Sequence, residues 1–318
     1  MVTSVTGGLA SAITRAASTQ TYYTIRLLVD PPRVDDAYRA YAYFRWVDDV
    51  LDAVQSPGWA GADVDRAERA RFLDRQKALL AACLRGAETG EVDRHEAMLV
   101  ELIRHAGASD PRLGAYLRSM MLVMEFDVGR RGRNISQQEL DDYTRSHAIA
   151  DTEAMHYFIG NGAAAPDDET RYMAVRGAHI VHMLRDTFVD VRAGYFNVPR
   201  EILEGYSIGP EDVRCDAYRA WVRDRVRLAR TSFDAGKTYF AGLHSRRHRL
   251  AGLLYMARFE WLIDTLERNR FTLQAEYPGR RHPATVVRTG RYLAATLARP
   301  RRVSHPAAPL SSPHGNRT

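Results

Sequence analysis

Two short segments of the chain each carry two aspartates spaced four residues apart. Asp48 and Asp52 form the first pair, and Asp186 and Asp190 form the second. On an α-helix, side chains four residues apart lie on the same face. Two carboxylates held side by side in apolar surroundings repel each other and are costly to take out of water unless cations neutralise them. The two pairs therefore predict a site that binds cations.

The donor atoms indicate which cation this would be. Carboxylate oxygens suit Mg²⁺, which binds through one or two carboxylates and completes its shell with water and substrate phosphates. Asp49 adjoins the first pair and is a further candidate ligand. Arg45 and Arg185 each lie within one turn of a pair, and a guanidinium group can bind phosphate oxygens in a fork. Each arginine is therefore predicted to contact a diphosphate or to hold the neighbouring aspartates.

The composition is that of a globular protein that acts in a reducing compartment. The chain has 318 residues, of which 45% are hydrophobic and 26% are charged. Its two cysteines are far apart, so the sequence predicts neither a disulfide framework nor a zinc site. The N-terminus lacks the apolar run of a signal peptide, and no segment is long and apolar enough to span a membrane. We expect a cytoplasmic protein.

The excess positive charge lies at the C-terminal end. The formal net charge is +6, and no acidic residue follows Tyr277, whereas arginines recur to the end of the chain. Apolar residues lie among these arginines at roughly helical spacing, which favours a short helix on an anionic membrane surface over nucleic-acid binding. A solvated terminal helix with a disordered end is the alternative. We expect one domain over residues 1–298 and a disordered basic tail over 299–318.

The hydrophobic period is helical almost throughout. Ser136 and Glu139 have the spacing of a capping box, which predicts a helix start. No alternating strand pattern or internal repeat interrupts the helical segments, so the sequence predicts a single all-α domain. The expected helices cover 34–54, 66–85, 136–159, 167–191, 216–243 and 248–273.

The two aspartate segments resemble the signatures of a known family. The segment from Tyr41 to Asp52 resembles the first aspartate signature of the squalene and phytoene synthases. The segment from Leu184 to Asp190, followed by Gly194 and Pro199, resembles the second. The resemblance implies an isoprenoid synthase-type helical bundle with a central cavity, magnesium, and prenyl diphosphate substrates such as farnesyl or geranylgeranyl diphosphate.

Weaker similarities extend over the rest of the chain. Thr21 and Tyr22 resemble part of the family's substrate flap, and Tyr41 matches a position at the mouth of its site. The segment 124–127 resembles the family's mid-chain acidic segment, and 140–143 resembles a helix start that contains Leu and Tyr. Thr21, Tyr22 and Tyr41 are therefore candidate substrate-binding residues. The arginine-rich run at 130–133 is interpreted as a solvated helix end.

The chain departs from the family's pattern around the second substrate. His179 and His182 replace the usual Gln and Asn, while Tyr195 and Asn197 fall within a segment that normally reads Gly-Arg-x-Tyr. A stretch of small residues in the family corresponds here to 147–152, which includes His147 and Asp151. Without a further ligand at matching spacing, the histidines are interpreted as residues that line the site rather than as metal ligands. The four replaced positions are candidate substrate-binding residues.

Three functions of different classes remain open. The first is a magnesium-dependent prenyltransferase that joins two prenyl diphosphates head to head with release of diphosphate. The second is a lyase, similar to class I terpene synthases, that ionises one prenyl diphosphate and cyclises or quenches the cation. The third is a non-catalytic scaffold, which the four aspartates disfavour because a scaffold has no use for adjacent like charges. Use of NADPH stays open, because the resemblance covers phytoene-type reactions, which need no reductant, and squalene-type reactions, which do. No dinucleotide-binding glycine motif follows a strand in this sequence.

Overall fold

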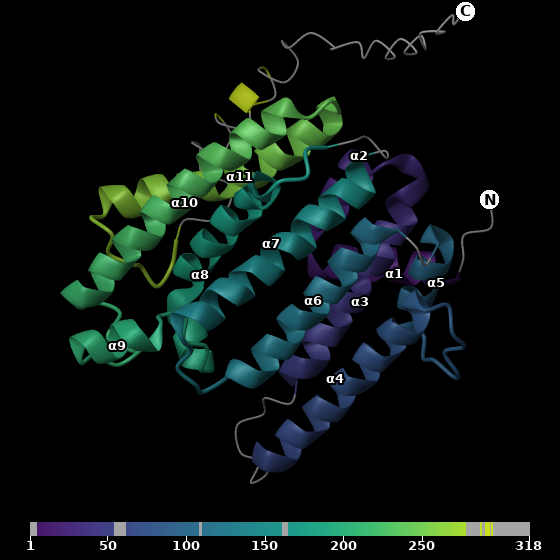
Figure 1. Cartoon of the computed structure of the whole chain (residues 1–318), viewed down its shortest axis with the longest axis horizontal. Helices are drawn as coiled ribbons and strands as arrows, with labels where there is room; N and C mark the ends of the chain where they lie inside the picture. Colours follow the sequence, from purple (N-terminus) through teal and green to yellow (C-terminus); the bar gives the residue numbers. More distant parts are fainter. Residues whose placement is uncertain are drawn as a thin grey trace, which may run out of the picture.

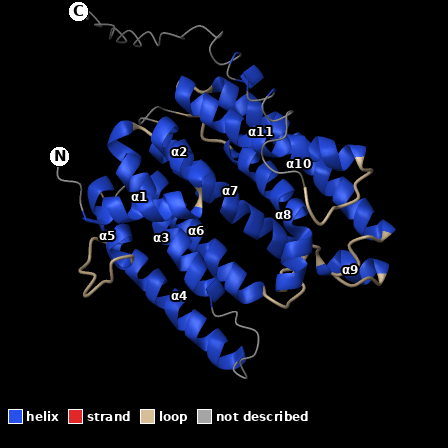
Figure 2. Cartoon of the chain, turned by 180° about the vertical axis from the view of Figure 1, so that it is seen from behind, coloured by secondary structure: helices blue, strands red, loops and turns tan. Residues whose placement is uncertain are grey.

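The computed structural model describes residues 5–53, 62–107, 110–160 and 165–277, together with 287, 290–292 and 294. Within these residues all regular secondary structure is helical, as Figure 2 shows, which confirms the predicted all-α class. The expected tail at 299–318 lies outside the described residues. The long helices are α1 (Val5–Ala17), α2 (Thr19–Leu28), α3 (Val34–Ala53), α4 (Ala62–Leu84), α5 (Glu96–Ala106), α6 (Pro111–Arg130), α7 (Gln137–Ile159), α8 (Met173–Ala193), α10 (Asp216–Gly242) and α11 (Arg246–Arg268). Short helical elements are η1 (Pro31–Arg33), η2 (Glu169–Tyr172) and α9 (Arg200–Tyr206).

The expected helices are present, with small shifts at their ends. The capping box at the start of α7 is formed, because Ser136 accepts a hydrogen bond from the backbone of Glu139 and the Glu139 side chain accepts one from the backbone of Ser136. The segment expected to begin at residue 167 instead starts with the 3₁₀ turn η2, and α8 follows it. The helices predicted over 34–54, 216–243 and 248–273 each begin within one turn of the predicted first residue. Periodicity alone therefore located these helices.

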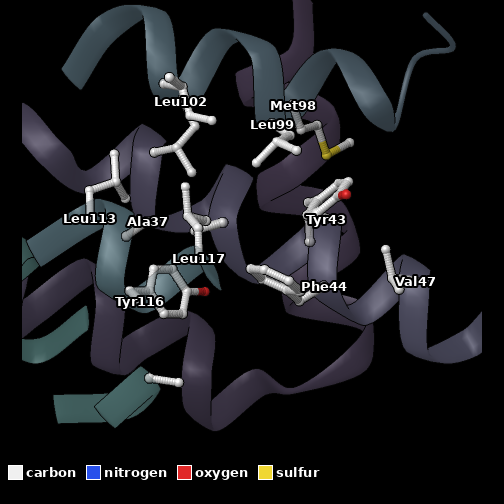
Figure 3. Packing of buried hydrophobic residues seen from close by; sticks show 14 of the residues in the cluster. Ala37, Tyr43, Phe44, Val47, Met98, Leu99, Leu102, Leu113, Tyr116 and Leu117 are labelled. Atoms are coloured by element: carbon white, nitrogen blue, oxygen red, sulfur yellow. The ribbon is translucent and has the colours of Figure 1, made fainter. Parts of the chain in front are cut away.

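The helices pack as a bundle around two hydrophobic cores. In Figure 1, α6, α7 and α8 run side by side across the middle of the molecule, and α6 with α7 and α7 with α8 are in direct contact. The first core lies among α1 to α6 and includes the end of α7, and the second lies among α8, α10 and α11. Figure 3 shows part of the first core, where Tyr43 and Phe44 of α3 lie near Leu99 of α5 and Leu117 of α6. Fully burying a large apolar side chain contributes roughly 1.5–3 kcal/mol, so these contacts fix how α3 is rotated.

A third, smaller apolar cluster joins the central helices near the aspartates. Val123 of α6, Leu140 and Tyr143 of α7 and Met183 of α8 pack together with Ile135. This cluster holds the C-terminal parts of α6 and α8 against the N-terminal part of α7. In the described part of the chain, no helix is both long enough and apolar enough to cross a membrane.

Candidate active site

The first aspartate pair lies on the side of α3 that faces away from the first core. Tyr43, Val47 and Leu51 are buried at four-residue spacing, and the helix period turns the aspartates to another face. The side chain of Asp48 is 43% exposed, and Asp52 is exposed, as is the adjoining Asp49. The expectation that this pair is buried is therefore wrong, because the aromatic neighbours in the sequence pack on the opposite side of the helix.

The second pair lies on α8 in the same manner. Ile180, Leu184 and Thr187 are buried, whereas Asp186 and Asp190 are partly exposed. Each of the two pairs therefore lies on a partly exposed face of its helix rather than in a core.

The two arginines predicted from the sequence hold the neighbouring aspartates. Arg185 donates two hydrogen bonds of 2.7 Å, from Nε and Nη2, to the two carboxylate oxygens of Asp186. Arg45 pairs with Asp49 and lies 3.4 Å from Asp48. Such forked contacts fix carboxylate orientation, and the guanidinium groups stay beside the site where an anion would bind.

A buried arginine of α6 connects this helix with α7 and with the loop after α8. Arg130 is 5% exposed and donates from Nε to Asp127 at 2.7 Å. Asp127 also accepts a hydrogen bond of 3.0 Å from the hydroxyl of Tyr143. The Arg130 guanidinium lies over the rings of Tyr143 and Tyr195, 4.7 and 5.0 Å from their centroids. The interpretation of 130–133 as a solvated helix end is thus wrong for Arg130, whose charge is neutralised inside the bundle.

Asn197 completes this link to the second pair. Its Oδ1 accepts a hydrogen bond of 2.7 Å from Arg130 Nη1, and its Nδ2 donates one of 2.8 Å to Asp190. The loop that carries Asn197 is tied to the turn after α6, because the backbone N–H of Gly132 donates to the carbonyl of Gly194 at 2.7 Å. Gly194 has φ +85° and ends α8 in the left-handed region that favours glycine. Asp127, Arg130, Asn197 and Asp190 therefore form one connected chain, which we call the Arg130 bridge.

Partial burial and, after it, neighbouring like charges raise the pKa of several carboxyls around this bridge. Burial and the neighbouring charge of Asp52 raise the pKa of Asp48 to about 6. Burial and the charge of Asp186 likewise raise the pKa of Asp190 to about 6. Burial and the charge of Asp127 raise the pKa of Asp52, which places the first pair within electrostatic reach of α6. The site therefore carries more negative charge than its own arginines neutralise.

Asp186 behaves differently from the other aspartates. Burial raises its pKa, but hydrogen bonds and charge from Arg185 and His182 outweigh this effect and hold the pKa well below its usual range. His182 Nε2 lies 2.9 Å from Asp186 Oδ2. His182 therefore acts within the second aspartate segment, whereas His179 is buried at the side of α8 that contacts α7.

The chain is similar to known proteins over most of its length. The model of the squalene/phytoene synthase family matches residues 14–288. This chain belongs to the squalene/phytoene synthase family. A solved structure of squalene synthase HpnC from Alicyclobacillus acidocaldarius is 20% identical, with a TM-score of 0.65 over 85% of this chain and 95% of that one. A dehydrosqualene synthase solved with a ligand is 11% identical, with a TM-score of 0.62 over 92% of this chain and 95% of that one. The search of curated proteins returned no match.

The residues that resemble the family's substrate flap lie apart from the aspartates. Thr21 is on α2, and its Oγ1 donates to Ser18 Oγ at 2.9 Å. Tyr22 stacks on Tyr38 of α3 with ring centroids 5.3 Å apart. Tyr41 is partly buried against the first core, one turn before Arg45. Thr21 and Tyr22 therefore lie on α2, and Tyr41 lies on α3 two turns before Asp48.

The carboxylates of the two aspartate segments are the donor groups available to a magnesium ion. In the described residues, no three His, Cys, Asp or Glu side chains converge closely enough to form an all-protein metal cage. Pairs of carboxylates with surplus negative charge and solvent access instead fit an ion that is held by one or two carboxylates and completed by water and phosphate oxygens. The aspartate segments fit magnesium in this way.

Proposed function

We propose that this protein is a magnesium-dependent prenyltransferase that condenses two prenyl diphosphates head to head and releases diphosphate. The proposal rests on one observation above all. The Arg130 bridge ties α6, whose Asp127 acts electrostatically on the first aspartate pair, directly to Asp190 of the second pair. Carboxylates more than a hundred residues apart in the sequence thus act on, or are bonded through Asn197 to, the same part of α6, which supports a site that binds a diphosphate between them.

The roles of the residues follow from their charges. Asp48, Asp49 and Asp52 would hold magnesium on one side of the site, and Asp186 and Asp190 would hold it on the other. When bound, magnesium neutralises the negative charge that develops on a leaving diphosphate. Arg45 and Arg185 fix the orientation of the aspartates and add positive charge beside the leaving group. Tyr195 and Asn197 position the side chains of Arg130 and Asp190, so they act on the site through these two residues.

One observation favours the alternative of a lyase that acts on a single prenyl diphosphate. His147 and Asp151 lie one turn apart on α7, and Asp151 accepts a hydrogen bond of 3.0 Å from Tyr255 of α11. These side chains occupy the stretch where the family usually has small residues. A cavity narrowed in this way would have less room for a second prenyl chain.

Product analysis separates these functions. The protein would be incubated with farnesyl or geranylgeranyl diphosphate, with and without magnesium and with and without NADPH. A product with twice the carbon count of the substrate is expected, and it should form only with magnesium. Products with the substrate's own carbon count would favour the lyase, and absence of any turnover would favour a scaffold.

Replacing Arg185 by Leu is expected to weaken inhibition by inorganic diphosphate about tenfold, because a charged hydrogen bond to a phosphate contributes about 1.5 kcal/mol. Inhibition constants would be measured for the wild type and the variant. Arg192→Leu is the matched control, since Arg192 is an exposed arginine on the last turn of the same helix. Equal inhibition constants in all three proteins would restrict Arg185 to orienting Asp186.

The stabilisation that magnesium provides is expected to decrease as the pH falls through 6. Asp48 and Asp190 have pKa values of about 6, and a metal binds only the ionised carboxylates. Below these pKa values the affinity should drop about tenfold per pH unit for each carboxyl. The measurement is the difference in melting temperature with and without magnesium between about pH 7.5 and pH 5.5. Taking this difference at each pH cancels the effect that titration of other groups has on stability. A difference that does not change with pH would contradict the assignment of Asp48 and Asp190 as magnesium ligands.

A further inference from the structure

A pair of stacked histidines lies inside the bundle, away from the aspartates. The rings of His147 on α7 and His179 on α8 are 4.1 Å apart with an angle of 28° between their planes. Tyr143 contacts both rings edge-on, with centroids 5.1 Å away in each case. Three aromatic side chains from two neighbouring helices therefore form one cluster.

One nitrogen of this pair lacks a protein partner. His179 is 8% exposed, and its Nε2 is buried with no hydrogen-bond partner among the residues that the structure describes. A buried polar atom without a partner costs roughly 1–3 kcal/mol, so such an atom calls for a functional explanation. The neighbouring His147 is half-buried.

The histidines lie in surroundings that keep them neutral. Burial lowers the pKa of His147 to about 4, and burial together with the nearby His147 lowers the pKa of His179 well below its usual range. The groups whose charges act on His179 are His147 of α7, His182 of the same helix, Arg130 of α6 and Arg225 of α10. All of these disfavour an added proton at rest. A carbon–hydrogen bond next to a cationic carbon is strongly acidic. A neutral imidazole is therefore basic enough to remove its proton.

The position of the pair suits a hydrocarbon chain held by its diphosphate. Residues 179 and 186 are seven residues apart on α8, which corresponds to about 10 Å along the helix axis. A prenyl chain whose diphosphate lies at Asp186 would extend along α8 past the histidines. The ring centroid of Phe259 on α11 lies 6.2 Å from that of His182 and 5.7 Å from that of Tyr255, so aromatic side chains also lie between α8 and α11.

We propose that His179, stacked on His147, is the base that removes a proton from the carbocation and so ends the reaction. In this step the carbon–hydrogen bond next to the cationic carbon breaks, and its electron pair becomes the second bond of a new carbon–carbon double bond. The proton goes to the imidazole and passes to solvent when the product leaves. Each cation that ends in this way accounts for one diphosphate and one proton, and no reductant is needed.

This inference rests on the proposed function, because it requires an ionised prenyl diphosphate. It applies equally to a cation derived from one substrate or from two. It predicts that the wild-type product is a hydrocarbon with an additional double bond, formed without NADPH. It further predicts that proton loss and ionisation can be separated by mutation, since His179 lies two turns away from the aspartates.

The test measures diphosphate release and product identity in the same reactions with magnesium. His179→Phe keeps the aromatic ring but removes the base, and His179→Gln keeps a polar group of similar size that is not basic. In both variants diphosphate release should stay within about threefold of wild type, while the ratio of water-quenched alcohol to hydrocarbon should rise at least about tenfold, because a positioned base contributes 10²–10⁴-fold. The exposed residue His244 provides the control His244→Phe, which should behave as wild type.

The outcomes are distinct. An unchanged product ratio in both variants, with melting temperatures near that of wild type, would overturn the role of His179. A wild-type protein that makes only an alcohol would also overturn it, since water rather than proton loss would then end the reaction. Absence of magnesium-dependent diphosphate release from the wild type would instead contradict the proposed function, and the inference would fall with it.

Discussion

Replacing Asp48 and Asp52 together by Asn is expected to lower magnesium-dependent diphosphate release by about 10³-fold or more, because these carboxylates would hold the cation that neutralises the leaving group. The fold should persist. The two side chains face away from the first core, and their mutual repulsion disappears in the variant. Diphosphate release and the melting temperature without magnesium would be measured together.

A matched control lies on the same helix. Asp35 is an exposed aspartate in the first turn of α3, at the other end from the pair. Asp35→Asn should keep full activity and lose only the small stabilisation of a carboxylate at a helix N-terminus, about 0.5 kcal/mol. The stabilisation by magnesium should vanish in the double variant and remain in the control. Full turnover in the double variant, or turnover that EDTA does not reduce, would refute the metal assignment.

Replacing Arg130 by Met is expected to lower the free energy of unfolding by about 1.5–3 kcal/mol, since it leaves the partly buried carboxylate of Asp127 without its cationic partner. The same change removes the hydrogen bond that Asn197 accepts from Arg130. Asn197, which donates to Asp190, is then less well fixed, and so is the Asp190 carboxylate. Activity should therefore fall even under conditions where the variant is folded. Denaturant unfolding gives the stability, and diphosphate release at low temperature gives the activity.

Two further variants make this prediction specific. Arg133→Met removes an arginine whose side chain is 45% exposed and pairs with Glu139 at the surface. It should cost at most about 1 kcal/mol. Asp127→Asn combined with Arg130→Met should cost less than the sum of the two single changes, because no charge is then left buried alone. Additive costs, or an Arg130→Met variant as stable as Arg133→Met, would contradict the electrostatic role of the Arg130 bridge.

Local spacing in the sequence determined the helices and the identity of the candidate ligands. The four-residue spacing of Asp48 with Asp52 and of Asp186 with Asp190 places each pair on one face of its helix. This placement does not depend on how the helices pack. The capping box of Ser136 and Glu139 is local for the same reason, and the structure forms it. Arg45 and Arg185 reach their aspartates within one turn, which helix geometry already allows.

Tertiary structure alone decided which residues are buried and which distant residues meet. The aromatic residues around Asp48 suggested burial, but packing of α3 against α5 and α6 turned those rings inward and the aspartates outward. Arg130 resembles its exposed neighbours in sequence, and only the approach of the loop after α8 gives it Asn197 as a partner. The stacking of His147 on His179 likewise requires that α7 and α8 lie side by side. Periodicity specifies which face of a helix a residue occupies, whereas the partner of that face depends on contacts between segments far apart in the chain.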